Sequence, residues 1–106
     1  NHHLLDTGAF NKMKDGVILI NTSRGGLINE DDLVNALNSG KIYAAGLDVI
    51  SEEPPRHDLG ILHCENATIT DHIAYLPKTS RLRSVSVAIS NFKAYLDGCP
   101  TSVINK

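Results

Sequence analysis

The stretch from Val17 to Gly26, which reads VILINTSRGG, decides the fold. It begins with a short, continuous run of aliphatic residues after the turn pair Asp15-Gly16, a pattern typical of a strand buried on both faces of a parallel sheet. In an open α/β sheet, ligands bind beyond the carboxyl ends of the strands. Arg24 follows this predicted strand closely enough to bind an anionic ligand, and the two glycines after it allow a close backbone approach.

The rest of the chain predicts a strand–helix–strand unit, a third strand and a long helix. Asn29 and Gly40 have the residue types expected at the beginning and end of a helix, and a right-handed crossover is expected between the flanking strands. The fold class is therefore α/β, with about three parallel strands and three helices that form part of a doubly wound sheet. The predicted elements are a helix over 4–14, a strand over 17–21, a helix from 29 to 40, a strand over 42–50, a polar connection over 51–65, a strand over 67–70 and a helix over 79–96.

The composition argues against several classes of function. The chain has 106 residues, is 42% apolar and has a formal charge of −2, which suits a small globular domain without a basic nucleic-acid-binding surface. No apolar run approaches the roughly 20 residues of a membrane span. Cys64 and Cys99 match no metal-binding or redox spacing. We therefore expect two reduced thiols in a cytoplasmic protein that binds neither nucleic acid nor membrane.

Three polar side chains follow the three predicted strands: Arg24, Glu53 and His72. The carboxyl ends of parallel strands lie at one edge of a sheet, so these side chains are expected to converge there. A guanidinium can hold a carboxylate through two hydrogen bonds, and an imidazole can give or take a proton near neutral pH. A carboxylate on the second ring nitrogen fixes the tautomer and favours the protonated form. This set suits proton transfer at the carbonyl or carbinol of a 2-oxo or 2-hydroxy acid.

Each of these residues also has a simpler interpretation. Alone, Arg24 is a surface arginine, Glu53 a solvated loop acid and His72 a hydrogen-bonded structural histidine. Only their common position after the predicted strands favours a shared functional site. A metal site is the weaker hypothesis, because the candidate ligands match no zinc spacing, and we predict no metal. Those candidates are His2, His3, His57, His63 and Cys64.

The successive motifs resemble those of the D-isomer-specific 2-hydroxyacid dehydrogenases. The resemblance covers almost the whole chain, and the second half of the motif series looks most like the glycerate dehydrogenase (hydroxypyruvate reductase) branch. A run of motifs in the same order and spacing is far more specific than any one of them. The matching segments are Asn21-Thr22-Ser23-Arg24-Gly25, Gly46-Leu47-Asp48-Val49, Glu53-Pro54-Pro55 and Thr70-Asp71-His72-Ile73-Ala74.

The resemblance implies a role for each matching residue. Arg24 would bind the substrate carboxylate and carbonyl oxygen, His72 would be the general acid/base, and Glu53 would orient and charge His72. The nicotinamide end of NAD would be bound by Thr22, Ser23, Asp48 and Ala74. The resemblance also implies a Rossmann-like fold, a small 2-hydroxy or 2-oxo acid as substrate, and a homodimer.

Two features depart from the family pattern. Asp71 precedes the histidine where the family usually has proline, which adds a second carboxylate near His72. No G-x-G-x-x-G motif is present, nor the acidic residue that binds the ribose after it. Because that acidic residue selects between the two cofactors, the sequence is compatible with NADP as well as with NAD. We expect residues 1–98 to form the carboxyl-terminal half of a dinucleotide-binding domain, with 99–106 a tail returning towards the substrate domain.

Two functions from different classes remain open. The first is hydride transfer between NAD(H) and a small D-2-hydroxy acid by a longer enzyme of which this chain is a fragment. The second is a non-catalytic, dehydrogenase-like binding or assembly module. The presence of Arg24, Glu53 and His72 together favours the enzyme, because a scaffold has no chemical need for all three. A metal-dependent hydrolase has little support.

Overall fold

A computed structural model of the chain describes residues 2–104. The chain divides into two compact units, residues 1–73 and 74–106, and each is described by itself. The first unit contains the sheet and all of the polar residues predicted to follow its strands. The second contains the long helix and the carboxyl-terminal tail.

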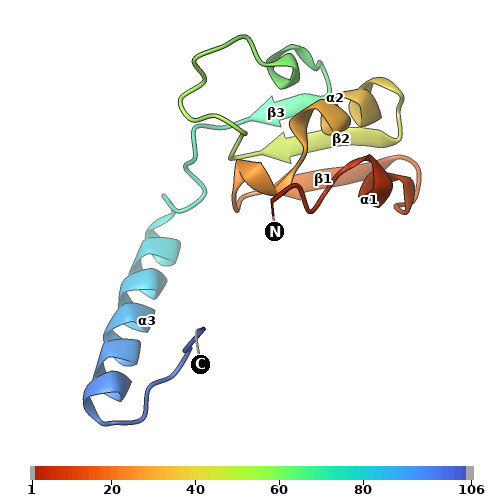
Figure 1. Ribbon diagram of the computed structural model, residues 1–106. Coiled ribbons are helices and arrows are strands. Elements are labelled where there is room, and N and C mark those ends of the chain that lie inside the picture. Colours follow the sequence, from red (N-terminus) through yellow and green to blue (C-terminus); the bar gives the residue numbers. More distant parts are fainter. Residues whose placement is uncertain (1, 105–106) are drawn as a thin grey trace. The chain divides into compact units, whose positions relative to one another are not determined.

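The sheet of the first unit has three parallel strands in the order β1-β2-β3 (Figure 1). β1 (Val17–Asn21) and β2 (Ile42–Leu47) are joined through the helix α2 (Glu30–Asn38), and β3 (Ala67–Ile69) lies on the other side of β2. The predicted α/β class, the three parallel strands and the strand–helix–strand unit are confirmed. β2 and β3 are shorter than predicted, because the chain leaves the ladder at Asp48 and Thr70 to form loops.

The helix α2 begins and ends as the sequence predicts. The side chain of Asn29 accepts a hydrogen bond from the backbone N–H of Asp32 at 3.2 Å. Gly40 follows the helix with φ of +77°, a conformation that glycine adopts without strain. Leu33 and Leu37 on the inner face of α2 are buried in the core.

The first helix, α1 (Thr7–Asn11), is much shorter than the predicted span of 4–14. The side chain of Asp6 caps it by accepting from the N–H of Ala9 at 2.9 Å. Leu5, however, is extended, because it pairs in parallel with Ile28 in an isolated bridge. That pairing uses the backbone groups that a longer helix would need.

The predicted polar connection over 51–65 contains a short 3-10 helix, η2 (Gly60–His63), and another, η1 (Gly25–Leu27), follows β1. Ile61 of η2 is fully buried. It joins a single core cluster with residues of α1, α2 and the inner face of the sheet. That cluster consists of Phe10, Ile28, Leu33, Ala36, Leu37, Ile42, Ala45, Leu47, Ile50 and Ile61.

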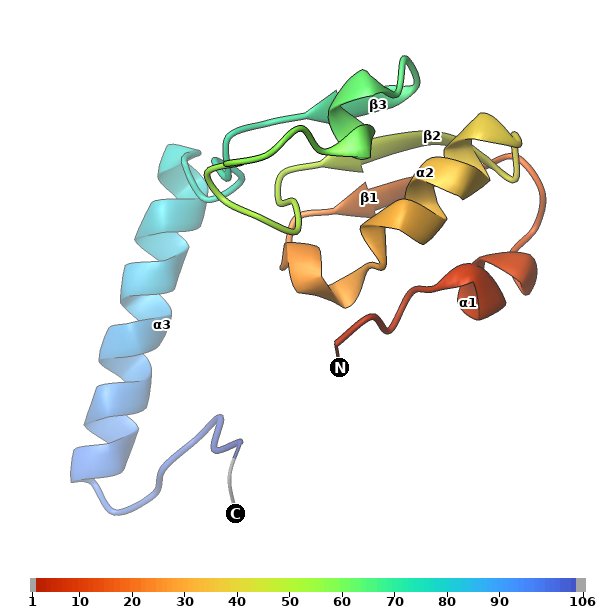
Figure 2. The ribbon, with the colours of Figure 1, turned by 45° about the horizontal axis from the view of Figure 1, so that its top comes forward.

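The prediction that β1 is buried on both faces is wrong for this unit. Leu19 packs against the core, whereas Ile18 and Ile20 on the opposite face are 64% and 72% exposed. The elements of the first unit that form the core lie on one face of the sheet, and Figure 2 shows α2 against that face. Because both faces of β1 are aliphatic, the sequence did not show which face the unit would cover.

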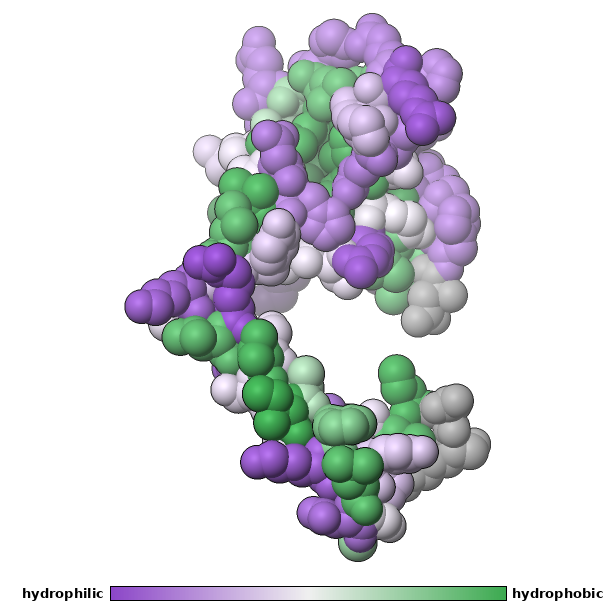
Figure 3. Space-filling model, turned by 90° about the vertical axis from the view of Figure 1, so that its left-hand side faces the viewer, coloured by the Kyte–Doolittle hydropathy of each residue, from purple (hydrophilic) through white to green (hydrophobic). Residues whose placement is uncertain are grey.

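The second unit contains α3 (Lys78–Leu96), which agrees with the prediction of a helix over 79–96. It ends at Gly98 with φ of +73°, and the N–H of Cys99 bonds back to the carbonyl of Ala94 at 2.9 Å. Apolar side chains are exposed along the helix (Figure 3). Exposed large apolar side chains that recur at helical spacing in α3 are Leu82, Val85, Ile89, Phe92 and Leu96. Residues 105 and 106 of the predicted tail lie outside the described residues.

Candidate active site

The residue that ends β1 fixes the loop that contains Arg24. The side chain of Asn21 is nearly buried, at 7% exposure. Its Oδ1 accepts from the backbone N–H of Ser23 at 3.0 Å, and its Nδ2 donates to the carbonyl of Arg24 at 2.9 Å. These two bonds hold the backbone of Arg24 at the carboxyl end of β1. Sequence reasoning did not single out Asn21, although a polar residue that ends an aliphatic strand is a recognisable signal.

Gly25 brings the segment after β1 against the segment after β2. A Cβ atom on Gly25 would lie only 1.8 Å from the carbonyl oxygen of Ile50, far inside contact distance. The close backbone approach expected at this glycine is therefore present, and the backbone that approaches is that of Ile50 and Ser51. Gly26 has no such restriction, because its nearest neighbour, a side-chain carbon of His2, is 3.8 Å from the Cβ position.

Glu53 uses its two carboxylate oxygens for two different partners. Oε1 accepts from the backbone N–H of Ile50 at 3.0 Å, and Oε2 lies 2.6 Å from Nδ1 of His72. The hydrogen bond with His72 holds the pKa of Glu53 below its ordinary value, and the charge of Arg24 acts in the same direction. The predicted pairing of Glu53 with His72 is present in the structure.

His72 lies in a loop that begins directly after β3. Its backbone has φ of +54°, in the left-handed region that side-chain-bearing residues rarely occupy. Oδ1 of Asp48 accepts from the hydroxyl of Thr70 at 2.5 Å and from the N–H of Ile73 at 2.9 Å. Asp48 is 5% exposed, so a nearly buried carboxylate at the end of β2 holds the loop on both sides of His72. Thr70 is a second residue that sequence reasoning did not single out.

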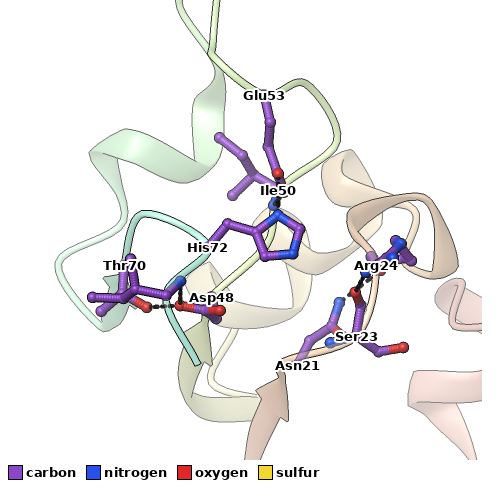
Figure 4. Close-up of polar contacts among 9 residues, drawn as sticks. Asn21, Ser23, Arg24, Asp48, Ile50, Glu53, Thr70 and His72 are labelled. Atoms are coloured by element: carbon purple, nitrogen blue, oxygen red, sulfur yellow. Dashed lines mark hydrogen bonds and ion pairs between the residues drawn. The ribbon is translucent and has the colours of Figure 1, made fainter. Parts of the chain in front are cut away.

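Figure 4 shows the imidazole of His72 between Glu53 and the loop after β1 that contains Arg24. His72 and Glu53 contact each other directly, while Arg24 lies at the same edge of the sheet with its Nη1 donating to the carbonyl of Ser23 at 2.7 Å. Thr22 and Ser23 follow β1 and are exposed, and Asp48 follows β2. Ala74 is the first residue of the second unit.

A pocket of about 360 Å³ adjoins the pair formed by His72 and Glu53. Carboxylates and the imidazole supply its polar groups, while proline and aliphatic side chains supply apolar ones. All of its lining residues belong to the first unit. They are Asp48, Ile50, Glu53, Pro54, Pro55, Leu62, Ile69, Thr70, Asp71 and His72.

Two further histidine–carboxylate pairs lie in the segment between β2 and β3. Nδ1 of His57 is 3.0 Å from Oε2 of Glu52, and Nε2 of His63 is 2.5 Å from Oδ1 of Asp58. Each pair consists of one histidine and one carboxylate. Within residues 2–104 no three His, Cys, Asp or Glu side chains form a group that could hold a metal ion. None of the described helices is long and apolar enough to cross a membrane.

Comparison with known proteins shows the family of the chain. Residues 1–74 match the family model described as D-isomer specific 2-hydroxyacid dehydrogenase, NAD binding domain. The chain belongs to this family. The four motif segments quoted from the sequence, which begin at Asn21 and end at Ala74, all fall within the matched residues. The resemblance drawn from the spaced motifs is thereby confirmed.

Relatives within the D-2-hydroxyacid dehydrogenase family include a hydroxypyruvate reductase of Blautia hydrogenotrophica, 55% identical over 90% of this chain and 30% of that protein. Among solved structures, a glyoxylate reductase from Paecilomyes thermophila matches with a TM-score of 0.71 and 35% identity, covering 88% of this chain and 28% of that one. A D-lactate dehydrogenase from Aquifex aeolicus, solved with NAD and lactic acid, matches with a TM-score of 0.68 and 35% identity over 92% and 34%. The chain spans about a third or less of the length of the curated relatives it matches.

Proposed function

We propose that this chain forms the nicotinamide-side part of the active site of a longer NAD-dependent D-2-hydroxyacid dehydrogenase. The enzyme transfers a hydride between NAD(H) and a small D-2-hydroxy or 2-oxo acid of the glycerate/hydroxypyruvate type. The observation that carries this proposal is the 2.6 Å contact between His72 Nδ1 and Glu53 Oε2 at the strand edge that also holds Arg24. In this arrangement an acid/base group, the carboxylate that orients it and a guanidinium lie at one ligand-binding edge.

In the direction of reduction, the three side chains have separate tasks. Arg24 binds the substrate carboxylate and polarises the carbonyl oxygen, because its planar fork matches both acceptors. His72 donates a proton from Nε2 to the carbonyl oxygen as that oxygen becomes a hydroxyl. Glu53 accepts the hydrogen bond from Nδ1, which orients the ring and stabilises its charged form. Oxidation of the hydroxy acid uses the same groups in reverse, with neutral His72 as the base.

The residues at the ends of β1 and β2 fit the nicotinamide end of the cofactor. Asp48 offers a carboxylate acceptor and Ser23 a hydroxyl at the edge where a carboxamide would bind, and we propose that Thr22 and Ala74 complete this part of the site. The cofactor supplies the hydride, and the protein supplies orientation and electrostatics. NADP is compatible with the same groups, since the residue that selects between the cofactors is not among them.

We further propose that the enzyme is a cytoplasmic homodimer that binds neither nucleic acid nor membrane. Both described cysteines, Cys64 and Cys99, are free thiols, as expected in a reducing compartment. Desolvation raises the pKa of Cys64, which keeps this thiol protonated and unreactive.

We also propose that residues 1–98 belong to the dinucleotide-binding domain and 99–106 to its return towards the substrate domain.

The proposed function is tested with purified full-length enzyme, NADH and a panel of 2-oxo acids that includes hydroxypyruvate, glyoxylate and pyruvate. The proposal expects NADH oxidation with at least one of them, with hydroxypyruvate preferred. A folded protein that binds NADH but oxidises it with none of these acids would instead indicate a non-catalytic dehydrogenase-like module.

A further inference from the structure

The loop that contains His72 is held in an unfavourable conformation by hydrogen bonds on both sides of the histidine. The φ of +54° at His72 costs free energy in any residue with a Cβ atom, so neighbouring contacts must stabilise it. On one side, the hydroxyl of Thr70 donates to Oδ1 of Asp48 at 2.5 Å; on the other, the N–H of Ile73 donates to the same oxygen at 2.9 Å. The N–H of His72 itself bonds to the carbonyl of Thr70 at 2.9 Å. The three bonds form one closed turn around the histidine.

We propose that Thr70, acting through Oδ1 of Asp48, is a positioning residue that sets the imidazole of His72 against Glu53. This inference rests on the function proposed above and adds a residue that its reaction scheme does not use. The hydroxyl of Thr70 donates to Asp48 and not to His72 or Glu53, so its effect on the imidazole is indirect. Its task is to keep the turn closed, so that Nδ1 of His72 stays within 2.6 Å of the Glu53 carboxylate.

The geometry of the turn explains why loss of the Thr70 hydroxyl should displace the imidazole of His72. Only one residue, Asp71, separates Thr70 from His72, and the hydrogen bond from the His72 N–H to the Thr70 carbonyl closes a tight turn between them. If Thr70 releases Asp48, the left-handed residue relaxes toward common backbone angles and the ring moves from Glu53. Displacements of about 1 Å at a reacting group lower rates by up to about a hundredfold.

Asp48 is a poor target for the test, because we also propose that it contacts the nicotinamide. Substitution of Thr70 separates the position of the loop from the nicotinamide contact. It leaves the Asp48 carboxylate in place and removes only the hydroxyl that donates to Oδ1, the oxygen that also accepts from the Ile73 N–H. Thr70→Val removes the hydroxyl at nearly constant shape, and Thr70→Ser restores it. Thr68, an exposed threonine of β3 two positions before Thr70, provides the matched control Thr68→Val.

The experiment measures hydroxy-acid oxidation and 2-oxo acid reduction by the full-length enzyme across pH. For Thr70→Val we expect kcat to fall about tenfold or more, with KM for NADH and for the acid within about twofold of wild type. The charged groups beside the ring are Asp48, Glu53 and Asp71, which line the same pocket, and Arg24, whose charge acts on Glu53. Because loss of the Glu53 contact disfavours the protonated ring, the acid limb of the oxidation profile moves to lower pH. Thr70→Ser restores rate and profile, and Thr68→Val leaves both unchanged.

A double-mutant cycle gives the most specific outcome. In a Glu53→Gln background, Thr70→Val should lower kcat much less than in the wild type, because the contact that Thr70 maintains is already lost. Equal effects in the two backgrounds, or a lower Tm with an unchanged pH profile, would overturn the positioning role. If Thr70→Val does not fold, Thr70→Ala tests the same hydroxyl by the same criteria. Failure of the proposed function itself would be distinguishable, because His72→Asn would then leave the rate unchanged.

Discussion

Arg24 is the side chain at which charge and geometry can be separated by substitution. In the full-length enzyme, Arg24→Ala should lower kcat/KM for the 2-oxo acid about a hundredfold or more, since each charge-assisted hydrogen bond is worth about 1.5–3 kcal/mol. Arg24→Lys should not restore activity, because a lysine lacks the planar fork that binds a carboxylate bidentately. Steady-state kinetics with both variants provide the measurement.

The matched control for Arg24 is Arg56→Ala, which removes an exposed guanidinium from the connection between β2 and β3. It should leave kcat/KM within about twofold of wild type, since surface charges act weakly through solvent. Wild-type turnover in Arg24→Ala or Arg24→Lys would remove Arg24 from the site.

Glu53 allows a pH-dependent test of the pair with His72. The lowered pKa of Glu53 keeps its carboxylate ionised at every pH at which an imidazole ordinarily titrates, so the charge stabilises the protonated ring. Glu53→Gln removes this charge. In hydroxy-acid oxidation His72 must be neutral to accept the proton, so the acid limb of the pH–rate profile should move to lower pH.

The neighbouring residue supplies a control for this test. Glu52 pairs with His57 at 3.0 Å, and that hydrogen bond lowers the pKa of Glu52 in the same way. Glu52→Gln should therefore leave the pH–rate profile unchanged. An identical profile for wild type and Glu53→Gln would mean that the pair with His72 does not act in the reaction.

The positions of Arg24, Glu53 and His72 could be predicted from the sequence, because each follows a strand whose aliphatic pattern is plain. The residues that hold them differ in this respect. Asn21 bonds to the backbone two and three positions ahead, so its place at the end of an aliphatic strand was a local signal. Thr70 bonds to a carboxylate 22 positions away, and pattern alone gives no such partner. The left-handed backbone of His72 likewise depends on these tertiary contacts.

At the scale of elements, the close contact between the segments after β1 and β2 aligns Arg24 with Glu53. Gly25→Ala should lower the midpoint of thermal unfolding by about 5 °C or more, because its Cβ would lie 1.8 Å from the Ile50 carbonyl oxygen and the backbone must shift. Differential scanning calorimetry of the full-length enzyme provides the measurement. Gly26→Ala is the control and should change the midpoint by less than about 2 °C. Equal shifts for the two variants would contradict this account of the contact.

The elements themselves were predicted unevenly, for physical reasons. α2 begins at the Asn29 cap and ends before Gly40, and α3 ends before Gly98, although no side chain caps its first turn. Apolar residues repeat at helical spacing in both helices, so their bounds agree closely with the sequence pattern. α1 is shorter at its amino-terminal end because Leu5 forms a bridge with Ile28, a tertiary pairing that helical spacing cannot indicate. η2 has one buried residue, Ile61, and the adjacent Leu59 and Cys64 pack against the core.

At the scale of the whole molecule, the 106-residue chain alone should neither reduce hydroxypyruvate nor bind NADH at micromolar concentration. The sequence has no glycine-rich turn with a following helix terminus to hold a pyrophosphate. β1 forms an edge of the described sheet and exposes Ile18 and Ile20, so the isolated chain should also self-associate. Calorimetric titration with NADH and light scattering test both expectations. A monodisperse monomer that binds NADH at micromolar concentration would contradict them.

In the reaction proposed for the full-length enzyme, His72 transfers the proton to the 2-oxo acid during its reduction. The most direct measurement is the rate of NADH oxidation with hydroxypyruvate by full-length wild type and His72→Asn, with NADH binding measured in parallel. General acid catalysis contributes about 10²- to 10⁴-fold, so the variant should lose that much in kcat while still binding NADH. A variant that keeps kcat within about twofold of wild type would contradict the account.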